Sequence, residues 1–167
     1  NLEGEVDSSH APFLHGSVGP DGMQPYNNNP DRQPVFQVLD TEFGVAIAAR
    51  RDAAEDEYYW RITPFMLPCC TIVPRAREAN YIFTAAVPCD DTTMMGMTVV
   101  WSPDRALPKG PPIVETDAQF RSLQNKRNDY LIDRELQKTA SFTGIRGVRV
   151  QDMAVQEDQR GPISDRS

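Results

Sequence analysis

The sequence feature that most constrains the fold is a series of short β-rich segments between residues 35 and 101. These segments are rich in β-branched and aromatic residues, and turn-forming or charged residues separate them. The segments are 35–40, 43–49, 58–65, 70–73, 81–87 and 93–101. Most of the separators are too short for the helical crossover that connects parallel strands. We therefore predict an antiparallel meander and exclude a doubly wound parallel sheet.

Helices are predicted near the two ends of the sequence. A helix within residues 1–15 should be kinked or broken near Pro12, because proline lacks a backbone N–H. Residues 16–34 are rich in Gly, Pro and Asn, which predicts a loop. One or two helices are expected in 119–139 and another in 148–159. Together with the strands, this pattern indicates an α+β fold.

Length, charge and cysteine content exclude several classes of protein. With 167 residues, a single domain over residues 1–167 could bury roughly 70% of its surface without disulfide or zinc staples. The net charge of −7 leaves no basic surface for nucleic acid. No apolar segment approaches the roughly 20 residues that cross a bilayer, so we expect a soluble protein without a membrane partner. Cys69, Cys70 and Cys89 form no disulfide framework, which predicts a cytoplasmic location.

The only two histidines of the chain, His10 and His15, lie close together near its start. Neutral imidazoles are the commonest transition-metal ligands, and Asp7 precedes His10 by three positions. Five positions along an ideal helix turn the second side chain well away from the first, so a shared metal needs the helix break expected near Pro12. The alternative is that both are ordinary surface or capping histidines.

A third candidate ligand is Asp152, a carboxylate flanked by apolar residues in the C-terminal predicted helix. A carboxylate among apolar neighbours needs a partner, and a metal ion is one. The alternative is a solvated acidic helix face, which suits Glu157 and Asp158 better than Asp152. Two histidines and one carboxylate match the facial triad that holds Fe(II) and leaves positions open for oxygen.

Three motifs follow one another in the chain, in residues 3–15, in 125–135, and in 142–145 with 150–157. In this order they resemble the catalytic domain of Rieske non-heme iron oxygenases, in the phthalate-dioxygenase-like branch of these aromatic ring-hydroxylating enzymes. The resemblance implies a helix-grip fold of the START or Bet v 1 type, in which a curved antiparallel sheet wraps around a long C-terminal helix. The predicted meander is consistent with this implied fold.

The resemblance assigns roles residue by residue. His10 and His15 match the two iron-binding histidines of the family, and Asp152 matches its carboxylate ligand. Asp158 is a weaker competitor for the carboxylate role. Asp7 matches the bridging aspartate, which links an iron-binding histidine to a histidine of the 2Fe-2S cluster in a neighbouring subunit. A carboxylate in this place also fixes the tautomer of the ligating histidine.

The implied activity is that of an oxygenase component with mononuclear Fe(II). It would use O2 to hydroxylate or oxidatively demethylate an aromatic acid or aryl ether, with electrons from NAD(P)H through a reductase or ferredoxin and the Rieske cluster. The full-length protein would be a homotrimer or a multiple of one. The Cys-x-His and Cys-x-x-His pairs that hold the cluster do not occur in the sequence. We therefore expect a fragment without the Rieske domain, inactive alone.

Substrate contacts are expected on the predicted sheet. Its concave face would line a pocket over the iron, and an arginine would bind a substrate carboxylate. Candidates for the pocket are Phe65, Met66, Met95, Met97, Val99 and Trp101, and candidates for the carboxylate are Arg50, Arg51, Arg61, Arg75 and Arg77. Apolar side chains of this kind are more often plain core, and surface arginines are more often solvated.

Two other functions stay open at this point. Helix-grip domains also carry lipids or steroids, so a non-catalytic domain that binds a hydrophobic ligand is one alternative. A cupin-like zinc or iron hydrolase would place its ligands on strands, whereas Asp152 belongs to a predicted helix. Metal content separates the carrier from the oxygenase, because a carrier has no use for His10, His15 and Asp152 together.

Overall fold

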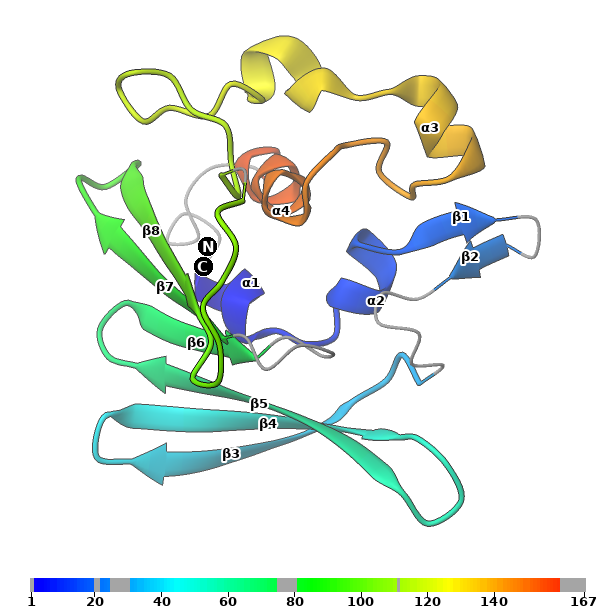
Figure 1. Ribbon diagram of the computed structural model, residues 1–167, viewed down its shortest axis with the longest axis vertical. Helices are drawn as coiled ribbons and strands as arrows, with labels where there is room; N and C mark the ends of the chain where they lie inside the picture. Colours follow the sequence, from blue (N-terminus) through cyan, green and yellow to red (C-terminus); the bar gives the residue numbers. More distant parts are fainter. Residues whose placement is uncertain (1, 20–21, 25–30, 75–80, 111, 160–167) are drawn as a thin grey trace. The chain divides into compact units, whose positions relative to one another are not determined.

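The computed structural model describes residues 2–19, 22–24, 31–74, 81–110 and 112–159. The chain divides into two compact units, one formed by Asn1–Ser9 with Asn29–Lys109 and the other by His10–Asn28 with Gly110–Ser167. Figure 1 labels the α-helices and strands of both units. In the described part of the chain, no helix combines the length and apolarity needed to cross a membrane.

The first unit is built on a six-stranded antiparallel sheet. Its strands are β3 (Val35–Thr41), β4 (Gly44–Asp52), β5 (Tyr58–Met66), β6 (Cys70–Pro74), β7 (Tyr81–Pro88) and β8 (Met94–Trp101). They are hydrogen-bonded in the order β3-β4-β5-β6-β7-β8, so each strand pairs with its neighbour in the sequence. The short helix α1 (Leu2–Val6) contacts β6. The predicted antiparallel meander and the α+β class are confirmed.

The largest difference between predicted and observed strand ends is in β4. Pairing continues past Ala49 to Asp52, which lies opposite Tyr58 on β5. The intervening arginines and Asp52 are charged, which is why a hydrophobicity pattern ends the strand too early. Backbone bonds close the hairpin beyond this point, since Ala53 N donates to Glu57 O at 3.1 Å.

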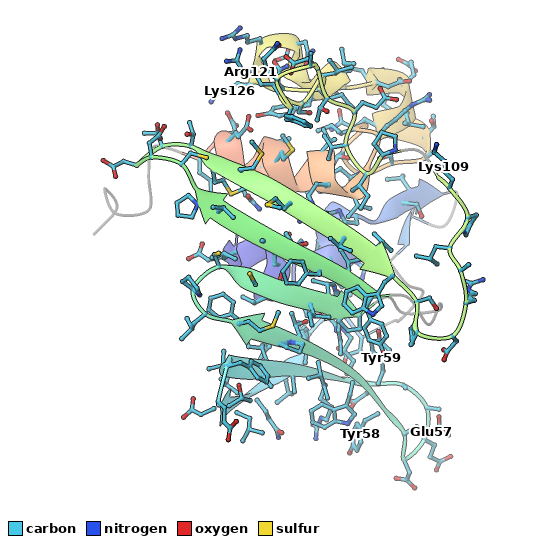
Figure 2. All side chains as sticks on the ribbon, turned by 60° about the vertical axis from the view of Figure 1, so that its left-hand side comes forward. Glu57, Tyr58, Tyr59, Lys109, Arg121 and Lys126 are labelled. Atoms are coloured by element: carbon cyan, nitrogen blue, oxygen red, sulfur yellow. The ribbon has the colours of Figure 1, made fainter. Side chains whose placement is uncertain are left out.

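The pleat of the sheet separates two unlike faces. Tyr58 and Tyr59, labelled in Figure 2, are consecutive residues of β5, so their side chains lie on opposite faces. The pairing register places five buried residues on the same face as Tyr59, each at most 4% exposed: Ala49, Arg51, Thr63, Thr71 and Thr84. The same register places four apolar residues on the face of Tyr58, each at least 50% exposed: Leu39, Ile62, Met97 and Val99. Towards the middle strands, the Tyr59 face is therefore buried and partly polar, whereas much of the Tyr58 face is apolar and exposed.

The six candidate pocket residues do not share one face. Phe65 and Met66 are neighbours on β5, and alternation sends their side chains to opposite faces. The register places Met66 with Met97 through Cys70 and Ala85, on the exposed face. The sequence left open which of the six line a pocket, and the register now divides them, since Phe65 lies on one face and the other five lie on the opposite face.

The second unit contains short helices and a two-stranded hairpin. Its elements are α2 (Ala11–Leu14), β1 (Ser17–Gly19), β2 (Gly22–Gln24), the 3₁₀ helix η2 (Lys126–Leu131), α3 (Arg134–Thr139) and α4 (Val148–Glu157). The predicted loop over 16–34 is wrong at β1 and β2, which pair antiparallel. Val18 N also donates to Ala140 O at 2.9 Å. A partner so distant in sequence leaves no signal in local composition, and residues 25–30 of the predicted loop lie outside the described residues.

The helix break predicted near Pro12 is present, but it lies before the proline. The chain leaves α1 at Val6, and Pro12 occupies the first turn of α2. The missing N–H of proline costs nothing there, because the first N–H groups of a helix have no intrahelical acceptor.

The core of the second unit holds α4 in place. Tyr130, Ile145 and Val150 are each at most 6% exposed and pack together, with Met153 and Ala154 of α4 against them. The Tyr130 hydroxyl donates to Glu157 Oε2 at 2.5 Å. The helical prediction for 119–139 is confirmed in part: η2 and α3 form, and Asp133 separates them and caps α3 by accepting from Leu136 N at 2.9 Å.

Candidate metal centre

Both histidines lie at the ends of the four-residue helix α2. His10 is its N-cap and His15 its C-cap. Leu14 N donates to His10 O at 2.9 Å and His15 N donates to Ala11 O at 3.2 Å, so the segment makes little more than one helical turn. At the end of this turn His15 leaves helical geometry, with φ −98° and ψ 9°. The short helix thus removes the objection that five positions on a continuous helix would point the two rings apart.

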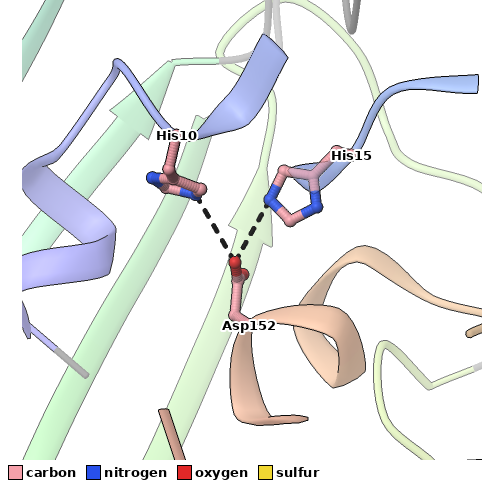
Figure 3. Close-up of side chains that lie close together, drawn as sticks. All are labelled: His10, His15 and Asp152. Atoms are coloured by element: carbon pink, nitrogen blue, oxygen red, sulfur yellow. Dashed lines mark ion pairs between the residues drawn. The ribbon is translucent and has the colours of Figure 1, made fainter. Parts of the chain in front are cut away.

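Asp152 projects from α4 towards the two rings. Its Oδ1 lies 3.4 Å from His10 Nε2 and 3.1 Å from His15 Nε2, as Figure 3 shows. The ring centroids are 5.2 Å apart, with an angle of 80° between the ring planes. One ligand atom from each of the three residues lies within 4.8 Å of the others. Among the described residues, this is the one group of three or more His, Cys, Asp or Glu side chains with such a spacing.

The carboxylate of Asp152 is ionised. Burial raises its pKa, but hydrogen bonds from His10 and His15 and their charge outweigh burial and bring the pKa to about 2. On the same helix, burial lowers the pKa of Arg149, and the negative charge of Asp152 opposes that shift. The second unit therefore keeps a negative charge where the two rings converge.

Gln151 also contacts the site, although the sequence analysis assigned it no role. Its side chain is 9% exposed, and its Oε1 lies 2.7 Å from His15 Nδ1. Its Nε2 donates to the carbonyl oxygen of Ile145 at 2.8 Å. The sequence could have pointed to Gln151 only through its position, because it is a polar residue between Val150 and Asp152 in a segment where other residues face the core.

The donor set fits a transition-metal dication. Two imidazole nitrogens and an ionised carboxylate oxygen converge from separate segments, as in the facial triad that binds Fe(II). A neutral ring that donates through Nδ1 keeps a lone pair on Nε2, and the Nε2 of His15 lies 3.1 Å from Asp152 Oδ1. Two acceptors at this distance need a proton or a cation between them.

Asp7 is placed separately, in the first unit and three residues before His10. Its Oδ1 accepts from Ser9 N at 2.7 Å and from Ser9 Oγ at 2.5 Å. Next to it, the buried guanidinium of Arg51 donates to Ser8 Oγ at 3.1 Å and to Ser8 O at 2.5 Å. The turn that carries Asp7 is thus tied to the sheet by Arg51.

The other candidate residues take different places. Asp158 has a side chain that is 83% exposed and lies 3.6 Å from Lys126 Nζ. The guanidinium of Arg50 lies 4.5 Å above the Tyr58 ring. Arg75 and Arg77 lie outside the described residues. Cys69, Cys70 and Cys89 are free thiols.

Comparison with known proteins places the chain in a family. The family model described as "LigXa C-terminal domain like" matches residues 1–167. The 3-chlorobenzoate-3,4-dioxygenase oxygenase subunit of Comamonas testosteroni is 35% identical over 191 aligned residues, which cover 99% of this chain and 44% of that protein. The phthalate 4,5-dioxygenase oxygenase subunit of Pseudomonas putida is 33% identical over 190 residues, which cover 99% of this chain and 42% of that protein.

The chain therefore spans less than half the length of these two curated relatives. The resemblance to the catalytic domain of ring-hydroxylating oxygenases, drawn from three motifs, is confirmed by these matches. The chain belongs to the LigXa C-terminal domain-like family.

Proposed function

We propose that this chain is the catalytic part of an oxygenase component that uses mononuclear Fe(II) and O2 to hydroxylate or oxidatively demethylate an aromatic substrate. The observation that carries the proposal is the approach of His10, His15 and Asp152 within 4.8 Å of one another. Both relatives are named as dioxygenase oxygenase subunits, and their names specify chlorobenzoate and phthalate. An aromatic carboxylate is therefore the substrate class to test first.

In this proposal His10, His15 and Asp152 hold the iron. The iron, when bound, supplies the redox chemistry with dioxygen. Asp152 contributes a full negative charge, since its pKa is about 2, and each histidine contributes a neutral nitrogen. The three side chains would leave other coordination positions of the ion open, which an oxygenase requires.

The remaining parts of the proposal concern the whole protein. Asp7 would link the iron site to a 2Fe-2S Rieske cluster of a neighbouring subunit, and a reductase or ferredoxin would deliver electrons from NAD(P)H. We also propose one catalytic domain over residues 1–167, a helix-grip fold, a homotrimer or a multiple of one, and a cytoplasmic location. The family match over residues 1–167 supports the single domain, and the antiparallel meander is consistent with the helix-grip fold. The free thiols Cys69, Cys70 and Cys89 support the cytoplasmic location.

The two alternatives are less well supported. A carrier of hydrophobic ligands has no need for three converging metal-ligand side chains, and the relatives are named as oxygenase subunits. A cupin-like hydrolase would hold its metal on strands, whereas Asp152 lies on α4 and both histidines flank α2.

Anaerobic loading with Fe(II) tests the metal centre. The wild-type chain should retain one iron, and Asp152→Ala should lose it, because two neutral imidazoles alone compete poorly with water for the dication. Asp158→Ala is the matched control, since it removes the same charge from the exposed end of the same helix. An iron-replete Asp152→Ala chain beside an iron-free Asp158→Ala chain would show that the wrong aspartate was chosen.

Oxygen incorporation tests the activity. The full-length protein, with its reductase and NADH, should transfer label from ¹⁸O2 to phthalate or 3-chlorobenzoate, and Asp152→Ala should abolish the transfer. A wild-type protein that binds Fe(II) yet labels no aromatic acid or aryl ether in such a panel would contradict the oxygenase assignment and favour another iron-dependent role.

A further inference from the structure

Gln151 spans the gap between the core of the second unit and the ring of His15. It lies next to Asp152 on α4 and is 9% exposed. Its side-chain amide has two partners, the carbonyl oxygen of Ile145 at 2.8 Å and the Nδ1 of His15 at 2.7 Å. Ile145 is 5% exposed and packs with Tyr130 and Val150, so the carbonyl belongs to a fixed part of the fold.

These two contacts require a proton on the Nδ1 of His15. A carbonyl oxygen only accepts, so the amide nitrogen of Gln151 must face Ile145. The amide oxygen of Gln151 then faces His15 Nδ1, and that oxygen also only accepts. Nδ1 is therefore the donor, and in a neutral ring Nε2 keeps its lone pair. The orientation of one amide thus assigns the Nδ1–H tautomer to a His15 ring that binds a metal through Nε2.

The selected tautomer is the one that can bind a metal at this place. The Nε2 of His15 is the atom that lies 3.1 Å from Asp152 Oδ1. A proton on Nε2 would occupy the position that a metal needs, whereas a proton on Nδ1 leaves it free. The same turn of α4 therefore supplies one candidate ligand, Asp152, and the group that orients another.

We propose that Gln151 is a positioning residue, which holds His15 as the Nδ1–H tautomer with its Nε2 lone pair directed at the metal. The proposal rests on the proposed function, because it assumes that His15 binds iron through Nε2. Gln151 acts through His15 and does not itself touch the metal. Its role is to lower the free energy needed to assemble the metal site.

Substitution of Gln151 tests this role through metal affinity. Gln151→Leu keeps the volume but removes both bonds, and the dissociation constant for Fe(II), measured anaerobically against a chromogenic chelator, should rise by about 10–100-fold. Gln151→Glu keeps an oxygen to accept from Nδ1 but loses the donor to Ile145 O, so it should recover part of that loss. Gln156→Leu makes the same exchange five positions along α4, on another side of the helix, and should change the constant by less than about threefold.

A second measurement needs no metal. In the metal-free Asp152→Ala chain, which has no carboxylate to accept from Nε2, ¹⁵N NMR of the histidine rings at a pH where they are neutral distinguishes a protonated nitrogen from a bare one. In this background His15 should be protonated at Nδ1, whereas adding Gln151→Leu should give a mixture that includes the Nε2–H form. Circular dichroism of each variant checks that the helices are retained.

The outcomes separate the two proposals. If Gln151→Leu folds, leaves the His15 tautomer of the Asp152→Ala background unchanged and binds Fe(II) as tightly as the wild type, while Asp152→Ala does not bind, the role of Gln151 is overturned and the metal centre stands. If the wild type binds no Fe(II), the metal centre fails and with it the positioning role. A tautomer that changes only in Gln151→Leu, together with weaker Fe(II) binding, supports both.

Discussion

His10 and His15 flank the same four-residue helix, yet their surroundings differ. The side chain of His15 is 4% exposed, and its two ring nitrogens face Gln151 and Asp152. The side chain of His10 is 26% exposed, and its Nε2 lies slightly farther from the same carboxylate oxygen, at 3.4 Å. The site thus combines a deeply buried candidate ligand with a more accessible one.

The supports behind the two histidines also differ. His15 is held by the side chain of Gln151 and, through Ile145, by the apolar core of the second unit. The turn before His10 is held by polar bonds in the first unit, from Arg51 to Ser8 and from Ser9 to Asp7. We call these the His15 arm and the His10 arm. The difference indicates that mutations of His15 or Gln151 should change metal binding and stability together, whereas mutations in the His10 arm should change one without the other.

The largest expected effect is the loss of either histidine. His10→Ala and His15→Ala should each weaken Fe(II) binding by more than the roughly 10–100-fold that loss of a supporting partner costs. In the metal-free chain, however, His15→Ala should also lower the free energy of unfolding by about 1–3 kcal/mol, because it leaves the buried oxygen of Gln151 without its donor. His10→Ala should lower the free energy of unfolding of the metal-free chain by a smaller amount. Urea denaturation of both metal-free variants checks this, and equal losses would contradict the comparison.

Asp7→Asn should separate metal binding from turnover. An amide oxygen can still accept from Ser9, as Asp7 Oδ1 does, so the turn and the iron content should be retained. Activity of the full-length protein should fall by about 10–100-fold, because a neutral amide couples less well to a cluster histidine. Iron stoichiometry beside single-turnover oxidation measures both quantities. Iron loss as large as that in His10→Ala would make Asp7 a ligand or a structural residue instead.

Arg51→Met should act on stability more than on the metal. Arg51 is buried, and its removal leaves the carbonyl and hydroxyl oxygens of Ser8 without their donors, which should lower the free energy of unfolding by about 2–3 kcal/mol. Fe(II) affinity should change much less, since the bonds of Arg51 end two residues before His10.

The neighbouring Arg50→Met is the matched control for this change. Arg50 lies on the opposite face of β4, with its guanidinium over Tyr58, and its removal should cost only about 0.5–1 kcal/mol. Thermal unfolding of the two variants compares the faces of the sheet. Similar losses would show that the bonds from Arg51 to Ser8 add no stability of their own.

The sheet was predictable because the sequence features that determine it lie within each strand and the short segment that follows it. Each strand of the first unit shows a β-rich segment, and short separators leave only antiparallel pairing between neighbours. The hairpin of β1 and β2 was missed because one of its supports, the bond from Val18 N to Ala140 O, joins residues far apart in sequence. The face of each pocket candidate was missed because consecutive residues such as Phe65 and Met66 alternate.

The candidate site divides in the same way. His10, His15 and Asp152 could be nominated from residue type and motif, and the structure brings them together; their role as ligands stays a prediction. For Gln151 the sequence shows only a polar residue beside Asp152, because its contact with His15 depends on the direction of the Ile145 carbonyl. That direction follows from a backbone between Gly144 and Gly147, both at positive φ, and sequence composition does not report it.

The smallest expected effect lies at the far end of the His15 arm. Tyr130→Phe removes the hydroxyl that donates to Glu157 Oε2 while leaving the ring packed on Ile145 and Val150, so the free energy of unfolding should fall by about 1 kcal/mol. Fe(II) affinity should not change, because Glu157 is five positions beyond Asp152 on α4. Glu157→Gln keeps an acceptor for the hydroxyl and should cost less than Tyr130→Phe. A Tyr130→Phe chain with weakened Fe(II) binding would instead show that the whole of α4, and not only the turn of Gln151 and Asp152, positions the metal centre.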